Sequence, residues 1–157
     1  MLIFDKKILR KRSVEWTGTE EDLDKLVDDM GSTMEEHNGI GISAIQIGVP
    51  ARVFIAEMEL FVNPKVVNRS PYMKKHWESC LSCPNTTVIT SRAAKITLKY
   101  DTIREGKWQN VEKIFTDWKL KKVSNTIHNM DYNIQRTTTT ATATKHKRTT
   151  KGGGVKA

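Results

Sequence analysis

Five short runs rich in β-branched residues lie between residues 51 and 100, and they limit the possible folds more than any other feature. The runs are Ala51–Ala56, Leu60–Val62, Lys65–Val67, Thr86–Thr90 and Ala94–Tyr100. Pro or Asn bounds them, and Pro64 and Pro84 are expected to mark strand ends. The runs predict several short strands in succession.

Amphipathic segments flank these strands. Thr17 stands three residues before Glu20, as in a capping box, and predicts the start of a helix that ends at Asn38-Gly39. A second helix is expected to begin near Asp117. Its apolar residues recur at steps of three and four, so one stripe should pack on the rest of the domain; they are Leu120, Val123, Ile127, Met130 and Ile134. Helix, strands and helix in this order predict an α+β fold with an antiparallel or mixed sheet.

The C-terminal residues 136–157 differ in composition from the rest of the chain. Residues 137–150 read TTTTATATKHKRTT and three glycines follow, so this basic, Thr-rich tail has little to bury and is predicted to be disordered. The folded domain is therefore expected over residues 1–135. The tail carries +6 of the net charge of +8. It could contact phosphates, for instance on the ribosome, although a solvated tail is the simpler interpretation because no aromatic residues interleave with the charges.

Length and composition exclude several classes of protein. A chain of 157 residues suits one domain, and no apolar run approaches the roughly 20 residues of a membrane helix. The segment Met1–Arg12 lacks the apolar stretch of a signal peptide. Two cysteines cannot form a disulfide framework. We therefore expect a cytoplasmic protein that makes no contact with a membrane.

Three segments carry residues suited to chemistry. In Gly39–Gln46, two glycines allow the backbone to lie close to a ligand. The same residues would also fit a simple helix stop followed by a turn. Cys80 and Cys83 form a C-x-x-C pair, which fits half a zinc site with His76, a redox pair, or one ligand of an open metal site. The segment His128–Tyr132 has the spacing of a zinc-binding helix, but it retains one His only.

Together, in this order and spacing, the three segments resemble the peptide deformylase family. The family signatures G-x-G-x-A-A-x-Q, E-G-C-L-S and H-E-x-D-H appear here as GIGISAIQ, ESCLS and HNMDY. The flanking sequences EEDLDKLVDDM, IGVPARVF and FVNPKVV are also similar to those of the family, and the resemblance covers about residues 1–135. It implies the deformylase fold, with small antiparallel or mixed sheets packed around a C-terminal motif helix.

The resemblance also implies a function in protein biosynthesis. Family members are metal-dependent hydrolases that remove the N-formyl group from the initiator methionine of nascent polypeptides, using one divalent metal, iron(II) or zinc. The site positions carried over are these: metal ligands at Cys80, His128 and Tyr132; catalytic groups at Gln46, the Leu81 N–H and Asn129; and substrate contacts at Ile40, Gly41 and Glu78. We further expect Glu78 to pair with Arg92, because an unpaired buried carboxylate is costly.

The third motif departs from the family at two positions. Asn129 replaces the Glu that moves the proton, and a carboxamide cannot act as a general base. Tyr132 replaces the second His, so we expect weak metal binding and impaired hydrolysis. Three alternatives remain: a catalytically dead relative that binds peptide N-termini or a partner, an altered reading frame beyond about residue 120, and a small zinc-stabilised binding module using His76, Cys80 and Cys83.

Overall fold

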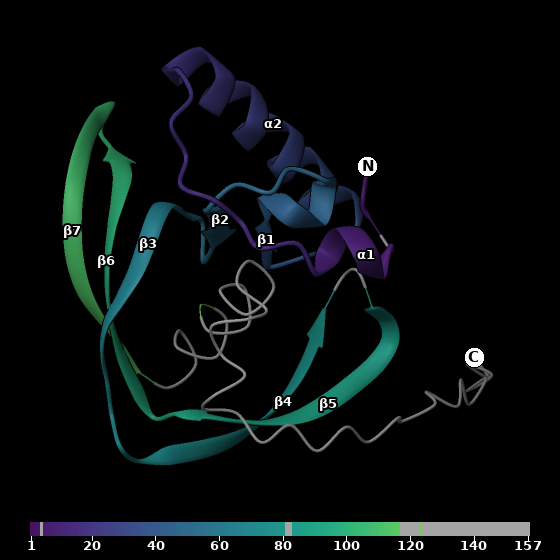
Figure 1. Ribbon diagram of the computed structural model, residues 1–157, viewed down its shortest axis with the longest axis vertical. Coiled ribbons are helices and arrows are strands. Elements are labelled where there is room, and N and C mark those ends of the chain that lie inside the picture. Colours follow the sequence, from purple (N-terminus) through teal and green to yellow (C-terminus); the bar gives the residue numbers. More distant parts are fainter. Residues whose placement is uncertain (4, 81–82, 117–122, 124–157) are drawn as a thin grey trace, which may run out of the picture.

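The computed structural model describes residues 1–3, 5–80, 83–116 and 123. It contains a five-stranded sheet in the order β1-β2-β3-β6-β7 and a separate two-stranded sheet, β4-β5 (Figure 1). The strands are β1 (Gly41–Ser43), β2 (Val53–Ala56), β3 (Glu59–Arg69), β4 (Met73–Cys80), β5 (Cys83–Ala93), β6 (Lys95–Arg104) and β7 (Lys107–Thr116). Neighbouring strands in both sheets pair antiparallel. The predicted α+β class with antiparallel sheets is confirmed.

The main helix, α2 (Glu20–Glu36), contacts β1 and the 3-10 turn η1 (Ala44–Ile47). A short helix, α1 (Lys6–Leu9), also contacts η1. In Figure 1, α2 crosses the top of the view, whereas the β4-β5 hairpin lies at the bottom. The helix and its turn are therefore grouped at the β1 end of the large sheet.

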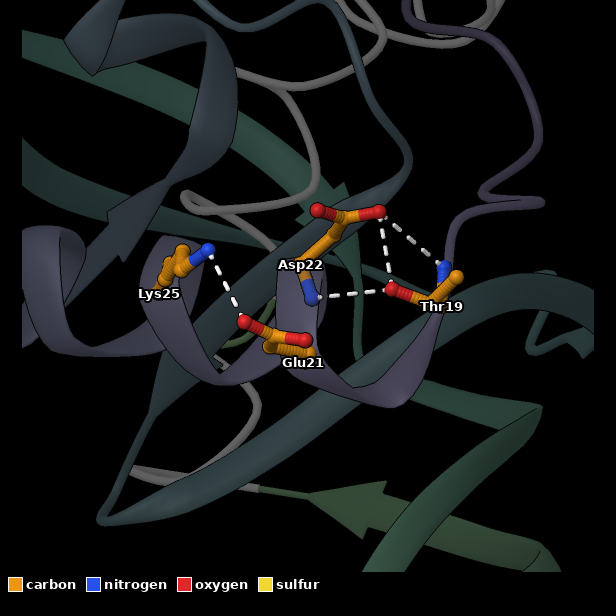
Figure 2. A network of polar contacts seen from close by, with 4 residues as sticks. All are labelled: Thr19, Glu21, Asp22 and Lys25. Atoms are coloured by element: carbon orange, nitrogen blue, oxygen red, sulfur yellow. Dashed lines mark hydrogen bonds and ion pairs between the residues drawn. The ribbon is translucent and has the colours of Figure 1, made fainter.

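The start of α2 corrects the prediction made from Thr17. The N-cap is Thr19, and Asp22 completes the capping box in place of Glu20 (Figure 2). The Asp22 N–H donates to Thr19 Oγ1 at 3.1 Å, and Thr19 Oγ1 donates to Asp22 Oδ2 at 2.8 Å. The hydrogen bonds that Thr19 Oγ1 and the Thr19 N–H donate to the carboxylate lower the pKa of Asp22. The helix begins at Glu20, directly after Thr19, whose φ of −75° and ψ of 166° are the extended backbone angles typical of an N-cap.

Strand β2 is buried on both faces, which explains its continuous apolar sequence VFIA. Val53 and Ile55 join a cluster with the α2 residues Leu23, Leu26 and Met30. On the opposite face, Phe54 and Ala56 join a second cluster around Phe61, Tyr100 and Phe115. Successive strand residues point to opposite faces, so one short strand connects two halves of the core.

The second cluster is built on packed aromatic rings, of which Phe54 and Phe61 are stacked and the others tilted. The Phe61 ring lies 4.3 Å from that of Phe54 and 4.4 Å from that of Tyr100, measured between centroids. Val123 is fully buried in this cluster. At this one position, the predicted apolar stripe of the second helix does pack on the sheet; its other residues, and the tail 136–157, lie outside the described residues.

Two strand predictions were wrong. The runs at 60–62 and 65–67 are one strand, β3, and Pro64 lies inside it rather than at an end. A register shift between Val62 and Lys65 accommodates the proline, because a bulge leaves a residue out of the hydrogen-bonded ladder. Pro84, in contrast, is the second residue of β5 and so does lie at a strand end, as predicted. Among the helices that the structure describes, none is long and apolar enough to cross a membrane.

Candidate functional site

The first motif forms the edge of the large sheet and the turn that follows it. Gly41, Ile42 and Ser43 pair with Ala56, Ile55 and Phe54 of β2. Among the described strands, β1 has β2 as its single neighbour and is therefore an edge strand of the five-stranded sheet. Ile40 comes just before this strand and its side chain is 58% exposed.

Gln46 is held beneath this edge. Its side chain is 1% exposed, and its Oε1 accepts hydrogen bonds from the Ser43 N–H at 3.0 Å and from Ser43 Oγ at 3.1 Å. Its backbone carbonyl accepts from the Ile3 N–H at 2.7 Å. With Oε1 turned to Ser43, the amide NH2 is the donor end of this side chain.

The turn that carries Gln46 requires a glycine. Gly48 has a φ of 89° and closes the 3-10 turn by donating its N–H to the Ile45 carbonyl at 3.0 Å. Because φ is positive, a side chain at this position would be strained. The conformation of Gly48 therefore helps to fix the position of Gln46.

Ser43 is a site residue that the motif comparison did not single out. It is fully buried, and both of its described donors reach Gln46 Oε1. A signal for it was present, since Ser43-x-x-Gln46 has the spacing of a capping box, in which the side chain at N3 reaches back to the cap N–H. This local rule would have predicted the contact.

Glu78 and Arg92 form the buried ion pair predicted from the sequence. Arg92 Nε donates to Glu78 Oε1 and Arg92 Nη2 to Glu78 Oε2, each at 2.6 Å, in a bidentate fork. The two side chains are only 2% and 5% exposed. This pairing ties β4 to β5 two residues before Cys80, the last residue of β4. We therefore assign Glu78 a structural role at this site: its carboxylate binds Arg92 and so helps to position the strand that carries Cys80.

The remaining predicted site residues lie outside what the structure describes. These are Leu81, His128, Asn129 and Tyr132, together with the side chain of Cys80. The predicted contact between Cys80 and His128 therefore stays a prediction. Within the described residues, no group of three His, Cys, Asp or Glu side chains could hold a metal ion.

The arrangement combines an edge strand, an exposed apolar side chain and a buried amide. Such an edge can pair with the backbone of an extended peptide. An amide NH2 can donate to a carbonyl oxygen, including one that gains negative charge during acyl transfer.

Comparisons with known proteins agree with this geometry. The sequence model of the family described as polypeptide deformylase matches residues 1–133. The peptide deformylase of Rhizobium meliloti is 38% identical over 121 residues, covering 71% of this chain and 69% of that protein. The peptide deformylase of Agrobacterium fabrum is 33% identical over 121 residues, covering 71% of each chain.

Solved structures show the same fold. A Plasmodium falciparum peptide deformylase in complex with an inhibitor superposes with a TM-score of 0.73 and 26% identity, covering 82% of this chain and 81% of that one. The peptide deformylase of Thermotoga maritima gives a TM-score of 0.72 and 27% identity, covering 80% and 86%. In sequence and in fold, the chain belongs to the peptide deformylase family.

Proposed function

We propose that this chain binds N-formylmethionyl peptides along the edge of β1 and deformylates them more slowly than its relatives do. The observation that carries the proposal is the buried Ser43–Gln46 pair beneath an edge strand that begins beside the exposed Ile40. The peptide backbone would pair with β1, and the Ile40 side chain would cover part of the peptide's first residues. These contacts require no group from the altered third motif.

Gln46 is the group proposed to hold the formyl oxygen. Ser43 engages the Oε1 end of its side chain, which directs the NH2 end as donor. A donor fixed before the substrate arrives loses little free energy to reorganisation, which is why preorganised donors are effective in catalysis. Burial also excludes water, which would compete for the same hydrogen bond.

The donor set for a metal does not match that of the family. Cys80 and His128 are ordinary ligands of a divalent metal, but Tyr132 replaces the third. A phenol has a pKa of about 10 and must lose its proton to bind a metal well. Asn129 also leaves no carboxylate to move a proton. These residues do not fit the metal site of the family, and we expect slow turnover.

Peptide binding can be tested with two isoleucines of equal exposure. Ile40 and Ile114 are each 58% exposed, but Ile114 lies on β7, at the opposite edge of the sheet. We expect I40D to weaken binding of a labelled formyl-Met-Ala-Ser peptide at least tenfold in fluorescence anisotropy, whereas I114D should leave it unchanged. Equal effects of the two variants, or no binding by the unmodified chain, would reject the proposed edge.

Turnover can be tested by restoring the third motif. We expect the N129E/Y132H variant to release formate from the same peptide faster than the unmodified chain, on the scale of ~10²–10⁴-fold that general acid–base groups supply. N129E alone should help little, and Y132H alone should raise metal affinity, measured by equilibrium dialysis, without restoring the full rate. An unmodified chain that already matches the double variant would show that another group replaces Asn129 and Tyr132.

A further inference from the structure

Charge is distributed unevenly over the folded part of the chain. Residues 60–100 contain seven basic residues and one acidic residue, a net charge of +6. The acidic residue is Glu78, whose carboxylate is buried against Arg92. Helix α2 has the opposite sign, with eight acidic residues and the single base Lys25. In Figure 1 the helix crosses the top of the view, and the turns from β3 to β4 and from β5 to β6 lie at the bottom.

A hollow of about 590 Å³ opens at this basic end of the molecule. It lies where β3 passes into β4 and β5 passes into β6. Its polar and aromatic lining includes Arg69, Ser70, Tyr72, Lys74, Lys95 and Thr116. Among the described residues that line it, none is acidic. A hollow of this size is within the range of ligand sites.

Backbone hydrogen bonds fix the walls of this hollow to each other. The Ser70 N–H donates to the Lys95 carbonyl at 2.8 Å, and the Ala94 N–H donates to the Tyr72 carbonyl at 2.7 Å. The Tyr72 N–H also donates to Ser70 Oγ at 3.1 Å, which closes the turn locally. Tyr72 is therefore held by its backbone, while its side chain is 77% exposed.

We propose that the hollow lined by Arg69, Tyr72, Lys74 and Lys95 is a docking site for a single-stranded nucleic acid. The three cations suit the phosphodiester backbone, and the exposed Tyr72 ring offers a face on which a base can stack. Basic grooves with aromatic faces are the usual means of binding single strands without reading their sequence. This site is separate from the β1 edge and does not depend on peptide binding or hydrolysis.

The aromatic ring distinguishes this partner from an acidic protein. A run of carboxylates would use the cations but would gain little from Tyr72, because it has no flat ring to stack. Both kinds of partner would lose affinity with salt, so salt dependence alone does not separate them. Replacing Tyr72 does separate them, since stacking contributes roughly 5–150-fold in affinity per base.

The test measures binding of fluorescein-labelled oligo-uridine RNA, oligo-dT DNA and poly-glutamate to the full chain by anisotropy. The charge variant is K74E/K95E, at two exposed lysines of the hollow. The matched control is K25E/K107E, which makes the same change in net charge at the α2 end, where Trp108 Nε1 donates to Glu20. All variants keep the basic tail, so its contribution is the same in each. Circular dichroism checks folding, and K74Q/K95Q replaces the charge variant if that variant is unfolded.

We expect K74E/K95E to weaken oligonucleotide binding at least tenfold and to reduce the slope of log affinity against log salt by about 1.4, as for two lost contacts. Y72A should weaken binding roughly 5–150-fold, whereas Y72F should not. A preference for RNA or for DNA would identify the natural strand. Equal weakening by K25E/K107E would reject the site. So would poly-glutamate binding as tight as that of RNA, or an effect of Y72A no larger than that of Y72F, because either result indicates an acidic protein or diffuse attraction.

Discussion

Single buried polar residues position the site. Gln46 and the ion pair of Glu78 with Arg92 are all less than a tenth exposed, so each must have its hydrogen bonds satisfied inside the protein. The Ser43–Gln46 contact spans three residues, and the Glu78–Arg92 contact spans fourteen. The local contact orients a donor, whereas the longer one connects two strands near Cys80. Loss of either partner removes hydrogen bonds from the interior.

We expect R92A to lower the free energy of unfolding by about 3–5 kcal/mol, because it leaves the Glu78 carboxylate buried without its partner. Chemical denaturation measures this change. The double variant E78L/R92M should recover much of the loss, since apolar residues of similar volume often replace a buried pair at little cost. The control is K25A, at an exposed ion pair with Glu21, which should change stability by less than about 1 kcal/mol. Equal costs for R92A and K25A would contradict the assignment.

A pH-dependent contribution to stability is expected from Glu59. Burial raises the pKa of this carboxyl, but hydrogen bonds from Arg104 and Tyr100 and the charge of Lys113 outweigh burial and lower it below 4.5. A pKa lowered by folding stabilises the protein above the unfolded value, and this contribution is lost as the pH falls through the folded pKa. E59Q should therefore cost more stability at pH 6 than at pH 3, measured by urea unfolding. A cost that does not change between these two pH values would contradict the expected linkage.

Helix α2 and strand β2 pack against each other and together position the β1 edge. The capping box at Thr19 defines where α2 starts, and its apolar stripe covers one face of β2. The other face of β2 carries the aromatic cluster. Because the β1 edge pairs with β2, the position of the candidate site depends on both of these elements.

The two threonines before α2 allow a direct test of the cap. T19A should destabilise the protein by about 0.5–2 kcal/mol, the usual cost of losing an N-cap, because it removes the acceptor for the Asp22 N–H. T17A removes the residue that the sequence pattern first suggested and should have little effect. Thermal unfolding of the two variants decides between the positions, and the reverse order of stability would place the cap at Thr17.

At the scale of the whole molecule, the two proposed binding sites lie in regions of opposite charge. The α2 end is acidic and lies beside the β1 edge, whereas the β3–β6 region is basic and carries the proposed nucleic-acid hollow. Opposite charges at two ends give the protein a preferred orientation toward a polyanion. A peptide bound at β1 would then lie away from a strand bound at the hollow. The two proposed sites do not compete for the same surface.

Two truncations should separate the tail from the domain. We expect deletion of residues 137–157 to change the melting temperature little, because this segment has few apolar residues with which to offset its ordering entropy. Deletion of residues 117–157 should lower it strongly, since it removes Val123 from the aromatic cluster. Scanning calorimetry compares the two. A large drop for the shorter truncation would show that the tail packs on the domain.

Apolar periodicity and motif spacing were enough to predict the helix before β1, strands in the regions of β2, β3, β5 and β6, and the family. These features depend on local patterns or on signatures that survive substitution. The pairing of Glu78 with Arg92 was expected because an unpaired buried carboxylate is costly. Strands β4 (MKKHWESC) and β7 (KWQNVEKIFT) were missed, because they are rich in charged and polar residues and form through pairing with β5 and β6. Strand preference depends strongly on such cross-strand neighbours. Likewise, Pro64 looked like a strand end until long-range pairing placed it at a bulge, and the basic hollow exists because two turns distant in sequence are joined by hydrogen bonds.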